Sequence, residues 1–360
     1  MKLGILKENH FSRVAIVPGS AKKLQNLGFE LVIEMSAGQN SGFTDNMYRD
    51  AGFEVVERSQ VFEKADVLVN IGPLQDNELS KLRQKSVYIS MFAPYQNENV
   101  VPQLSKYNVN FMSMDMIPRT TIAQSMDVLS SMASLAGYKA VLQAANHYNN
   151  MFPMMMTAAG TIPPTKVMVL GAGVAGLQAI ATAKRLGAVV EAFDTRAAAK
   201  EEVKSLGATF VEVEGASDDK GAGGYAVQQT EEYLQKQRKL VQEKALKSNI
   251  IIATAQVRGR KAPVLISEDT VENLKPGSVI VDLAASTGGN CAYTENNKTI
   301  VKNGVTIIGN SDLADELPGV ASTLYSNNVI NFLQVLIKDG AVVLNEENDI
   351  IKSVLISKAN

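Results

Sequence analysis

Three glycines in one short segment are spaced to form a phosphate-binding turn. The segment Gly171-Ala172-Gly173-Val174-Ala175-Gly176 follows an apolar run and leads into a helical pattern. The first glycine permits a tight turn, the second lets a pyrophosphate approach the backbone, and the third lets the helix pack closely on the sheet. The N–H groups at the start of such a helix attract anions. The segment therefore predicts a dinucleotide-binding turn, with a glycine-rich turn that has no ligand as the alternative.

An acidic residue ends the next predicted strand, roughly 20 residues after the glycine turn, which is the position of the ribose-binding acid in this motif. A carboxylate at Asp194 would accept hydrogen bonds from the ribose hydroxyls of NAD and repel the 2′-phosphate of NADP. Arg196 lies close by and complicates this choice. We expect NAD to be preferred over NADP.

The composition narrows the possible chemistry. The chain has 360 residues, 46% of them apolar and 20% charged, and its net charge is −2, so two globular domains are expected and no nucleic-acid or anionic-membrane surface is indicated. The single cysteine, Cys291, cannot form an internal disulfide and fits a reducing compartment. His10 and His147 are the only histidines, which leaves little material for a metal site. We expect no metal ion, and we expect the chain to be soluble because no apolar run is long enough to span a membrane.

Short apolar runs alternate with helical patterns along most of the chain, which predicts parallel sheets with helices on both faces. Strands are expected at residues 3–6, 30–33, 66–71 and 87–91 in the first half, and at 167–170, 188–193, 209–213, 249–253, 278–282 and 305–308 in the second. We therefore predict the α/β class, with two Rossmann-like, doubly wound parallel-sheet domains.

Two helical patterns define the expected domain organisation. A long one at residues 124–148 is suited to joining the domains, and one at 321–338 is expected to pack back on the first domain. We therefore assign residues 1–125 and 320–360 to an N-terminal Rossmann-like domain, which is discontinuous. Residues 126–319 form the NAD(H)-binding Rossmann domain with the linking helix. A cleft is expected between the two.

Two segments interrupt this alternation. The connector at residues 151–164 contains Met151, Met154, Met155 and Met156, which we interpret as core filler rather than a binding surface. Residues 215–225 are small, polar and rich in glycine. A loop of this kind is either a flexible linker or a lid over a ligand.

Several motifs are shared with a known superfamily. Lys7-Glu8 precedes Arg13-Val-Ala-Ile-Val-Pro18, and Arg119-Thr-Thr-Ile-Ala-Gln124-Ser-Met-Asp127-Val-Leu-Ser130 is the most specific segment. Together these resemble the alanine dehydrogenase and transhydrogenase superfamily. Within it, the chain is most similar to the NAD(H)-binding component (domain I, the first segment of the alpha subunit) of proton-translocating NAD(P) transhydrogenase, over nearly its whole length.

The resemblance implies hydride transfer from NADH to NADP⁺ bound on a partner subunit, coupled to proton translocation. Arg119, Asp127 and Ser130 would hold the nicotinamide end of NAD(H), and Gln124 would reach towards the NADP(H). Direct hydride transfer needs no general acid, base or metal, which fits a chain with so little histidine. Without the motif, the residues alone would favour another interpretation, in which Arg119 and Asp127 are a charge pair at a helix start and Ser130 is an ordinary residue on the helix face.

Further residues complete the predicted nucleotide site. They are Thr195 and Arg196 beside Asp194, Gly224 and Tyr225 in the loop that resembles the family's mobile loop, and Gln237 and Gln256. The resemblance also implies a homodimer that works with an NADP(H)-binding subunit and membrane-spanning subunits. The expected location is peripheral, on the cytoplasmic face of the inner membrane, without direct membrane insertion.

Two alternative functions fit fewer of these residues. An alanine dehydrogenase would need a Lys and a His after two first-domain strands, but residues 69–73 read Val-Asn-Ile-Gly-Pro and residues 90–94 read Ser-Met-Phe-Ala-Pro. A non-catalytic NAD-binding module would keep Gly171–Gly176 and Asp194 but would have no reason to keep the segment from Arg119 to Ser130. Both alternatives therefore explain less of the sequence than the transhydrogenase does.

Overall fold

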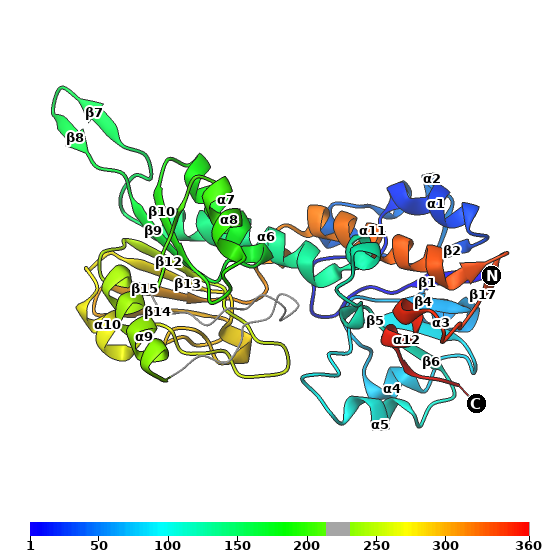
Figure 1. The fold of residues 1–360 in the computed structure, drawn as a ribbon. Coiled ribbons are helices and arrows are strands. Elements are labelled where there is room, and N and C mark those ends of the chain that lie inside the picture. Colours follow the sequence, from blue (N-terminus) through cyan, green and yellow to red (C-terminus); the bar gives the residue numbers. More distant parts are fainter. Residues whose placement is uncertain (214–230, 360) are drawn as a thin grey trace. The chain divides into compact units, whose positions relative to one another are not determined.

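The computed structural model describes residues 1–213 and 231–359 (Figure 1). The chain forms two compact units, Met1–Met132 with Ala314–Asn360 and Ala133–Leu313, which we call unit 1 and unit 2. Within the described residues each unit is built on a seven-stranded, mostly parallel sheet, so the predicted α/β class is confirmed. The first boundary lies inside the long helix α6 (Val128–His147), whereas the sequence-based division places it just before that helix.

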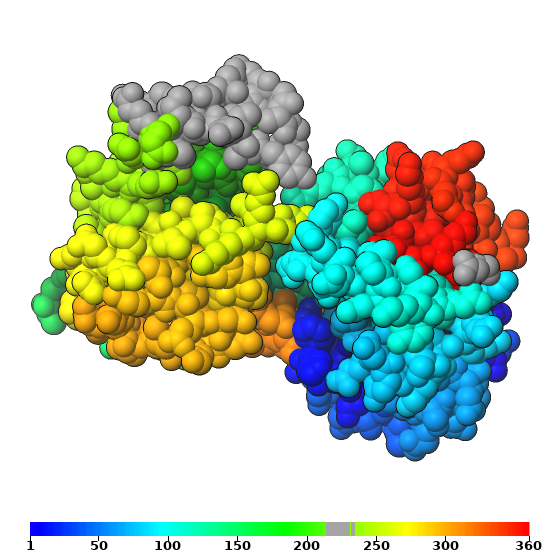
Figure 2. Space-filling model, turned by 90° about the horizontal axis from the view of Figure 1, so that it is seen from below, coloured from blue at the N-terminus to red at the C-terminus, as the bar shows by residue number. Residues whose placement is uncertain are grey.

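The sheet of unit 1 has the strand order β18-β6-β5-β4-β1-β2-β3. Its strands are β1 (Lys2–Ile5), β2 (Glu30–Glu34), β3 (Phe53–Val56), β4 (Val67–Val69), β5 (Val87–Ser90), β6 (Asn110–Ser113) and β18 (Leu355–Ser357). All neighbours are parallel except β18, which runs antiparallel to β6. Figure 2 shows the consequence on the surface, where the red C-terminal segment lies against cyan residues of the first half of the chain.

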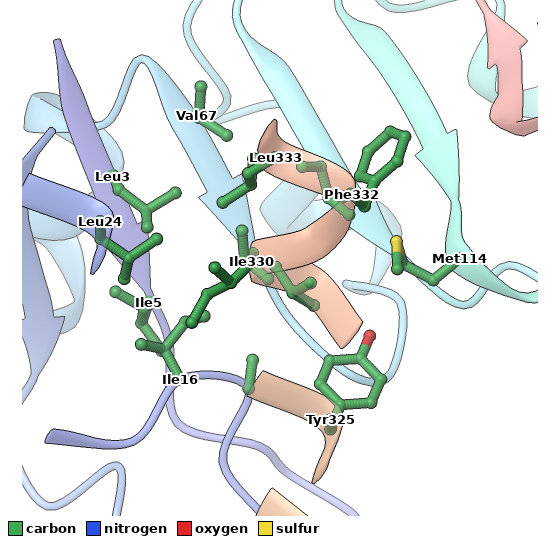
Figure 3. Close-up of a cluster of buried hydrophobic side chains, with 14 of the residues drawn as sticks. Leu3, Ile5, Ile16, Leu24, Val67, Met114, Tyr325, Ile330, Phe332 and Leu333 are labelled. Carbon is green, nitrogen blue, oxygen red and sulfur yellow. The ribbon is translucent and has the colours of Figure 1, made fainter. Parts of the chain in front are cut away.

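Side chains alternate between the two faces of this sheet, because successive residues of a strand point in opposite directions. Leu3 and Ile5 of β1 belong to a core that includes Ile330 and Leu333 of the long helix α11 (Pro318–Leu336) (Figure 3). Gly4 lies on the other face, where a Cβ would stand 2.6 Å from the Cβ of Ala65. Both faces are thus covered, as in a doubly wound fold.

The remaining elements of unit 1 are short. The helices are α1 (Ala21–Asn26), α2 (Asp45–Asp50), α3 (Arg58–Lys64), α4 (Asp76–Leu79), α5 (Val100–Leu104) and α12 (Asp349–Val354). The 3-10 turns are η1 (Pro18–Ser20), η2 (Gln39–Ser41), η3 (Met114–Met116), η4 (Thr121–Met126) and η6 (Leu313–Glu316), and β16 (Ile337–Lys338) pairs with β17 (Ala341–Val342).

The sheet of unit 2 has the order β11-β10-β9-β12-β13-β15-β14 and is parallel except for the pair β14–β15. Its strands are β9 (Lys166–Leu170), β10 (Val189–Phe193), β11 (Thr209–Phe210), β12 (Ile250–Ala253), β13 (Val279–Asp282), β14 (Lys298–Lys302) and β15 (Val305–Gly309). The other elements are α7 (Val174–Arg185), α8 (Ala199–Ser205), α9 (Glu231–Ala245), α10 (Glu268–Asn273) and η5 (Ala285–Thr287). Strand order reverses between β9 and β12, which is the position where ligands bind in open α/β sheets.

The structure corrects two local predictions. The helix expected at residues 124–148 begins only at Val128, because η4 precedes it and Asp127 has an extended backbone. The connector at 151–164 contains a hairpin, β7 (Met155–Thr157) and β8 (Gly160–Ile162) (Figure 1). Met154 and Met156 are 60% and 74% exposed, so interpreting these methionines as core filler was wrong.

Candidate functional site

The glycine turn follows β9 and opens α7, as the sequence predicts. Gly171 has φ +94°, a left-handed conformation that favours glycine. A Cβ on Gly176 would stand 1.8 Å from the carbonyl oxygen of Gly171, so the helix packs against the turn without room for a side chain. Gly173 differs, because a Cβ there would meet no atom of residues 1–213 or 231–359 within 4 Å. Gly173 therefore has open space above its backbone, which is what a pyrophosphate needs.

Two further residues shape this turn. The hydroxyl of Thr254, just after β12, donates to the carbonyl oxygens of Leu170 and Gly171 at 3.2 and 3.0 Å. A Cβ on Gly137 of α6 would stand 2.0 Å from the carbonyl oxygen of Ala175, so α6 crosses the start of α7 at very close range. The sequence-based site included neither residue. A glycine inside a long helical pattern was the signal for Gly137, since glycine is unfavourable there without a packing reason.

Asp194, at the end of β10, holds the turn to the strand. Its carboxylate accepts hydrogen bonds from the N–H of Ala172 at 2.7 Å and of Arg196 at 2.8 Å, and from the guanidinium of Arg196. Burial acts to raise the pKa of Asp194, but the hydrogen bonds from Arg196 and Ala172 and the charge of Arg196 outweigh it, and the net shift is downward. The carboxylate is therefore ionised at neutral pH. Thr195 and Val174 are exposed beside it.

A buried polar network fixes the loops after β12 and β13. The carboxylate of Asp282, which is 0% exposed, accepts hydrogen bonds from the N–H groups of Ala284, Asn290 and Cys291 and from the hydroxyl of Thr294. The side chain of Asn290 then bonds to both the N–H and the carbonyl of Ala255. The sequence reasoning missed this network. Its signal was an aspartate directly at a strand end.

Four further candidates belong to unit 2, and the structure describes two of them, Gln256 and Gln237. The amide of Gln256 donates to the carbonyl oxygen of Leu283 at 2.8 Å, so Gln256 belongs to the loop that the Asp282 network fixes. Gln237 of α9 is 7% exposed and its Oε1 has no hydrogen-bond partner within residues 1–213 and 231–359. Gly224 and Tyr225, with the predicted lid at 215–225, lie outside the described residues.

The other four candidates lie together on unit 1, around η4 and the start of α6. Asp127 caps α6, because its Oδ1 accepts from the N–H of Ser130 at 2.9 Å and its Oδ2 from the Ser130 hydroxyl at 2.6 Å. Arg119 and Gln124 are exposed, and in the described part of the chain their side chains form no hydrogen bond or ion pair. Among the described residues, Arg119 and Asp127 form no ion pair, so the alternative of a charge pair at a helix start is not observed. Asp127 and Ser130 bond to each other at the start of α6, and both remain partly exposed.

Unit 1 also has a cavity of its own, at the carboxyl ends of β1 and β4. It measures about 310 Å³, and its lining includes Glu8, Phe11, Asn70 and Met91. Glu8 is 8% exposed and accepts from the N–H groups of Ile71 and Gly72. Burial raises the pKa of Glu8 to about 7, although these hydrogen bonds act in the opposite direction.

The candidates thus form two groups. Gly171, Ala172, Gly173, Val174, Gly176, Asp194, Thr195 and Arg196 surround the start of α7 on unit 2, and Arg119, Gln124, Asp127 and Ser130 surround the start of α6 on unit 1. The fit of unit 2 to a dinucleotide rests on Gly173, where the backbone is open, and on the ionised Asp194 one strand away. Along the described chain, no helix is both long and apolar enough to cross a bilayer.

Comparison with known proteins identifies the family. Residues 4–136 match the family described as alanine dehydrogenase/PNT, N-terminal domain, and residues 140–360 match its C-terminal domain. NAD(P) transhydrogenase subunit alpha of Cereibacter sphaeroides is 44% identical over 99% of this chain and 70% of its own length. The first segment of NAD(P) transhydrogenase subunit alpha of Rickettsia prowazekii is 40% identical, over 99% of this chain and 95% of its own.

A solved structure agrees with these sequence matches. The transhydrogenase of Sinorhizobium meliloti is 42% identical and superimposes with a TM-score of 0.91, covering 100% of this chain and 99% of that one. The predicted resemblance is therefore confirmed. The chain belongs to the alanine dehydrogenase/PNT family and, within it, to the NAD(P) transhydrogenase alpha subunits.

Proposed function

We propose that this chain is the NAD(H)-binding subunit of a proton-translocating transhydrogenase, an enzyme active only with partner subunits. It exchanges hydride with NADP(H) bound on one of them. The observation that supports the site assignment is the exposure of the Arg119 and Gln124 side chains. Both side chains are exposed and without a bonding partner in the described part of the chain, on a segment whose neighbours Ala123 and Met126 are buried in the core of unit 1. Such side chains are available for a ligand while their backbone is held.

Different residues are proposed to bind different parts of NAD(H). The backbone at Gly173 and the first N–H groups of α7 bind the pyrophosphate, since a helix start favours anions. Asp194 accepts hydrogen bonds from the ribose hydroxyls. Arg119, Asp127 and Ser130 hold the nicotinamide end, where the bound nucleotide supplies or accepts the hydride. Thr195, Arg196, Gln237, Gln256, Gly224 and Tyr225 complete the proposed set.

The proposed reaction requires no acid or base catalysis from these side chains. A hydride moves between two carbon atoms without an accompanying proton, so no general acid or base is needed. The protein contributes apposition of the two rings and exclusion of water. Gln124 fits this task, because an amide hydrogen-bonds a second nucleotide without bringing charge into a dry site.

The partners follow from the same proposal. NADP(H) is bound by a second subunit, and membrane-spanning subunits translocate the proton and hold this chain at the cytoplasmic face of the inner membrane.

We also propose a homodimer, supported by the β7–β8 hairpin. An isolated two-stranded hairpin is marginally stable, and this one exposes Met154 and Met156, so a second copy of the chain is the occupant that we assign to it. Analytical ultracentrifugation of Met156→Lys tests this, with a monomer as the expected result and an unchanged mass against it.

The decisive experiment for the function compares two reactions of the purified chain. Alone, it is expected to bind NADH but to show no turnover with alanine, pyruvate or another amino or oxo acid. With the NADP(H)-binding subunit added in trans, it is expected to catalyse hydride transfer between NADH and an oxidised NAD analogue. Turnover of alanine by the chain alone would instead establish the dehydrogenase alternative.

A further inference from the structure

Helix α11 carries a line of polar side chains through the interior of unit 1. They recur at three- and four-residue spacing, so each lies near the next, and the line winds around the helix from Ser322 to Asn331. The hydroxyls of Ser322 and Ser326 accept hydrogen bonds from the N–H groups of Val14 and Val17. Three residues after Ser322, the hydroxyl of Tyr325 donates to the carbonyl oxygen of Asn70 at 3.1 Å. The helix thus ties loops of the first sheet together.

The last members of this line reach η4, the turn that carries Gln124. The side-chain amides of Asn328 and Asn331 both donate to the carbonyl oxygen of Ser125, at 2.8 and 3.0 Å. Ser125 directly follows Gln124 in the chain. One backbone carbonyl is therefore held from two positions on a rigid helix, immediately beside a side chain that projects outward.

Stability alone does not explain Asn328. This residue is 6% exposed, and its Oδ1 is buried with no hydrogen-bond partner in the part of the chain that the structure describes. A buried polar atom without a partner lowers the stability of the fold, because no hydrogen bond compensates for its loss of solvation. Turning the amide over would not help, since Oδ1 would then face the Ser125 carbonyl oxygen. An apolar side chain of the same size, such as leucine, avoids this cost.

We propose that Asn328 and Asn331 are positioning residues for hydride transfer, which fix the backbone of Ser125 and through it the direction of Gln124. This inference rests on the role proposed for Gln124. The side chains of Ala123 and Met126 already anchor η4 in the core. Apolar contacts alone, however, leave the backbone of a turn free to shift by fractions of an ångström. Two donors on one carbonyl remove that freedom.

The test uses three matched variants on α11 in the full chain. Asn328→Leu removes the contact and the unpartnered oxygen together, and Asn331→Leu is a milder variant at a half-buried position. Asn327→Leu is the control, because Asn327 is exposed and its side chain makes no hydrogen bond among the described residues. Thermal unfolding, NADH affinity, amide hydrogen exchange and hydride transfer with the NADP(H)-binding subunit are measured for each.

For Asn328→Leu we expect an unchanged or higher Tm, NADH affinity within about twofold of wild type, and hydride transfer slowed roughly tenfold, since small misplacements are costly for rate. The N–H groups of Ala123 and Asp127, which donate to the carbonyl oxygens of Thr120 and Gln124, should exchange faster. Asn331→Leu should show the same changes more weakly, and Asn327→Leu none. A lower Tm for Asn328→Leu, with NADH affinity lost in proportion, would overturn the proposal in favour of a structural role.

A Gln124→Ala background separates this inference from the proposed function. If Asn328 acts through Gln124, the double variant transfers hydride no more slowly than Gln124→Ala alone. Unchanged transfer in Gln124→Ala would refute the role of Gln124 itself. Slow transfer in Gln124→Ala, together with unchanged exchange and transfer in Asn328→Leu, would refute only the positioning by Asn328.

Discussion

The guanidinium of Arg196 binds the carboxylate of Asp194 through two hydrogen bonds of 3.0 Å, from Nε to Oδ1 and from Nη2 to Oδ2. The same carboxylate accepts the N–H of Ala172 in the glycine turn. The acid that we propose discriminates against a 2′-phosphate therefore has a cation as its immediate partner. We therefore propose that cofactor preference depends on this pair rather than on Asp194 alone.

Replacing Asp194 with alanine should change cofactor preference in both directions. NADH affinity should fall by about tenfold or more, because charge-assisted hydrogen bonds to the ribose are lost. NADPH affinity should rise, because the carboxylate that would repel a 2′-phosphate is removed while the positive charge of Arg196 remains. Fluorescence titration with both nucleotides measures this. The double variant with Arg196→Ala is the control and should lose the gain, whereas equal NADH and NADPH affinity in wild type would refute the assignment.

Two glycines of the turn should respond differently to alanine. Gly173→Ala has space for its methyl group and an allowed φ of −76°, so its Tm should be unchanged, but the methyl group obstructs the pyrophosphate and NADH affinity should fall at least about tenfold. Gly176→Ala collides with the Gly171 carbonyl and should destabilise the fold by roughly 3 kcal/mol or more. Thermal unfolding and NADH titration of both variants decide this. Normal NADH binding by a folded Gly173→Ala would show that the pyrophosphate lies elsewhere.

Asp127 should contribute separately to stability and to binding. Asp127→Ala removes the cap of α6 and should cost about 1 kcal/mol, whereas Asp127→Asn keeps a capping side chain and should cost little. Both variants should weaken NADH binding, because both remove the charge proposed to face the nucleotide. Urea unfolding and NADH titration on the same samples separate these effects. If Asp127→Asn bound NADH like wild type, Asp127 would be a helix cap only.

The buried Glu8 should make the stability of unit 1 depend on pH. Its pKa of about 7 lies above the ordinary value of 4.5, so between these pH values the folded chain holds more protons than the unfolded chain. Stability from this group is therefore fully present below pH 4.5 and is lost as the pH rises through 7, at no more than about 1.4 kcal/mol per pH unit. Urea unfolding of wild type and Glu8→Gln from pH 5 to 8 measures the difference. Parallel pH curves for the two proteins would contradict it.

Periodic patterns were enough to predict most of the fold, because fully buried parallel strands such as β9 and β12 are continuous apolar runs with few alternatives. The strands that were missed lie mostly towards the sheet edges. β14 begins and ends with a lysine, which interrupts the apolar pattern. β18 pairs with β6, a strand far earlier in the chain. The start of α6 was misplaced because the pattern continues through residues 124–127. The break there depends on the capping bond between Asp127 and Ser130, which periodicity does not report.

The site was predictable where local backbone geometry requires a residue type, as at Gly171 and Gly176. It was not predictable where distant residues meet. Thr254 reaches the glycine turn from another strand, Asn290 bonds to Ala255, and Asn328 reaches Ser125 from the far end of the chain. No spacing within one segment encodes these contacts. The arginine partner of Asp194 was visible in the sequence, but its bidentate geometry was not.

In the proposed mechanism, Gln124 serves the transfer step and not the binding of NAD(H). Gln124→Asn shortens the amide arm by one methylene without changing its chemistry, and a misplacement of about 1 Å can cost on the order of 10²-fold in rate. The direct measurement is NADH titration of the isolated chain together with stopped-flow hydride transfer in the reconstituted complex, on one preparation. NADH affinity near that of wild type with markedly slower transfer is the predicted result. Unchanged transfer, or a loss of binding large enough to account for the slower rate, would contradict it.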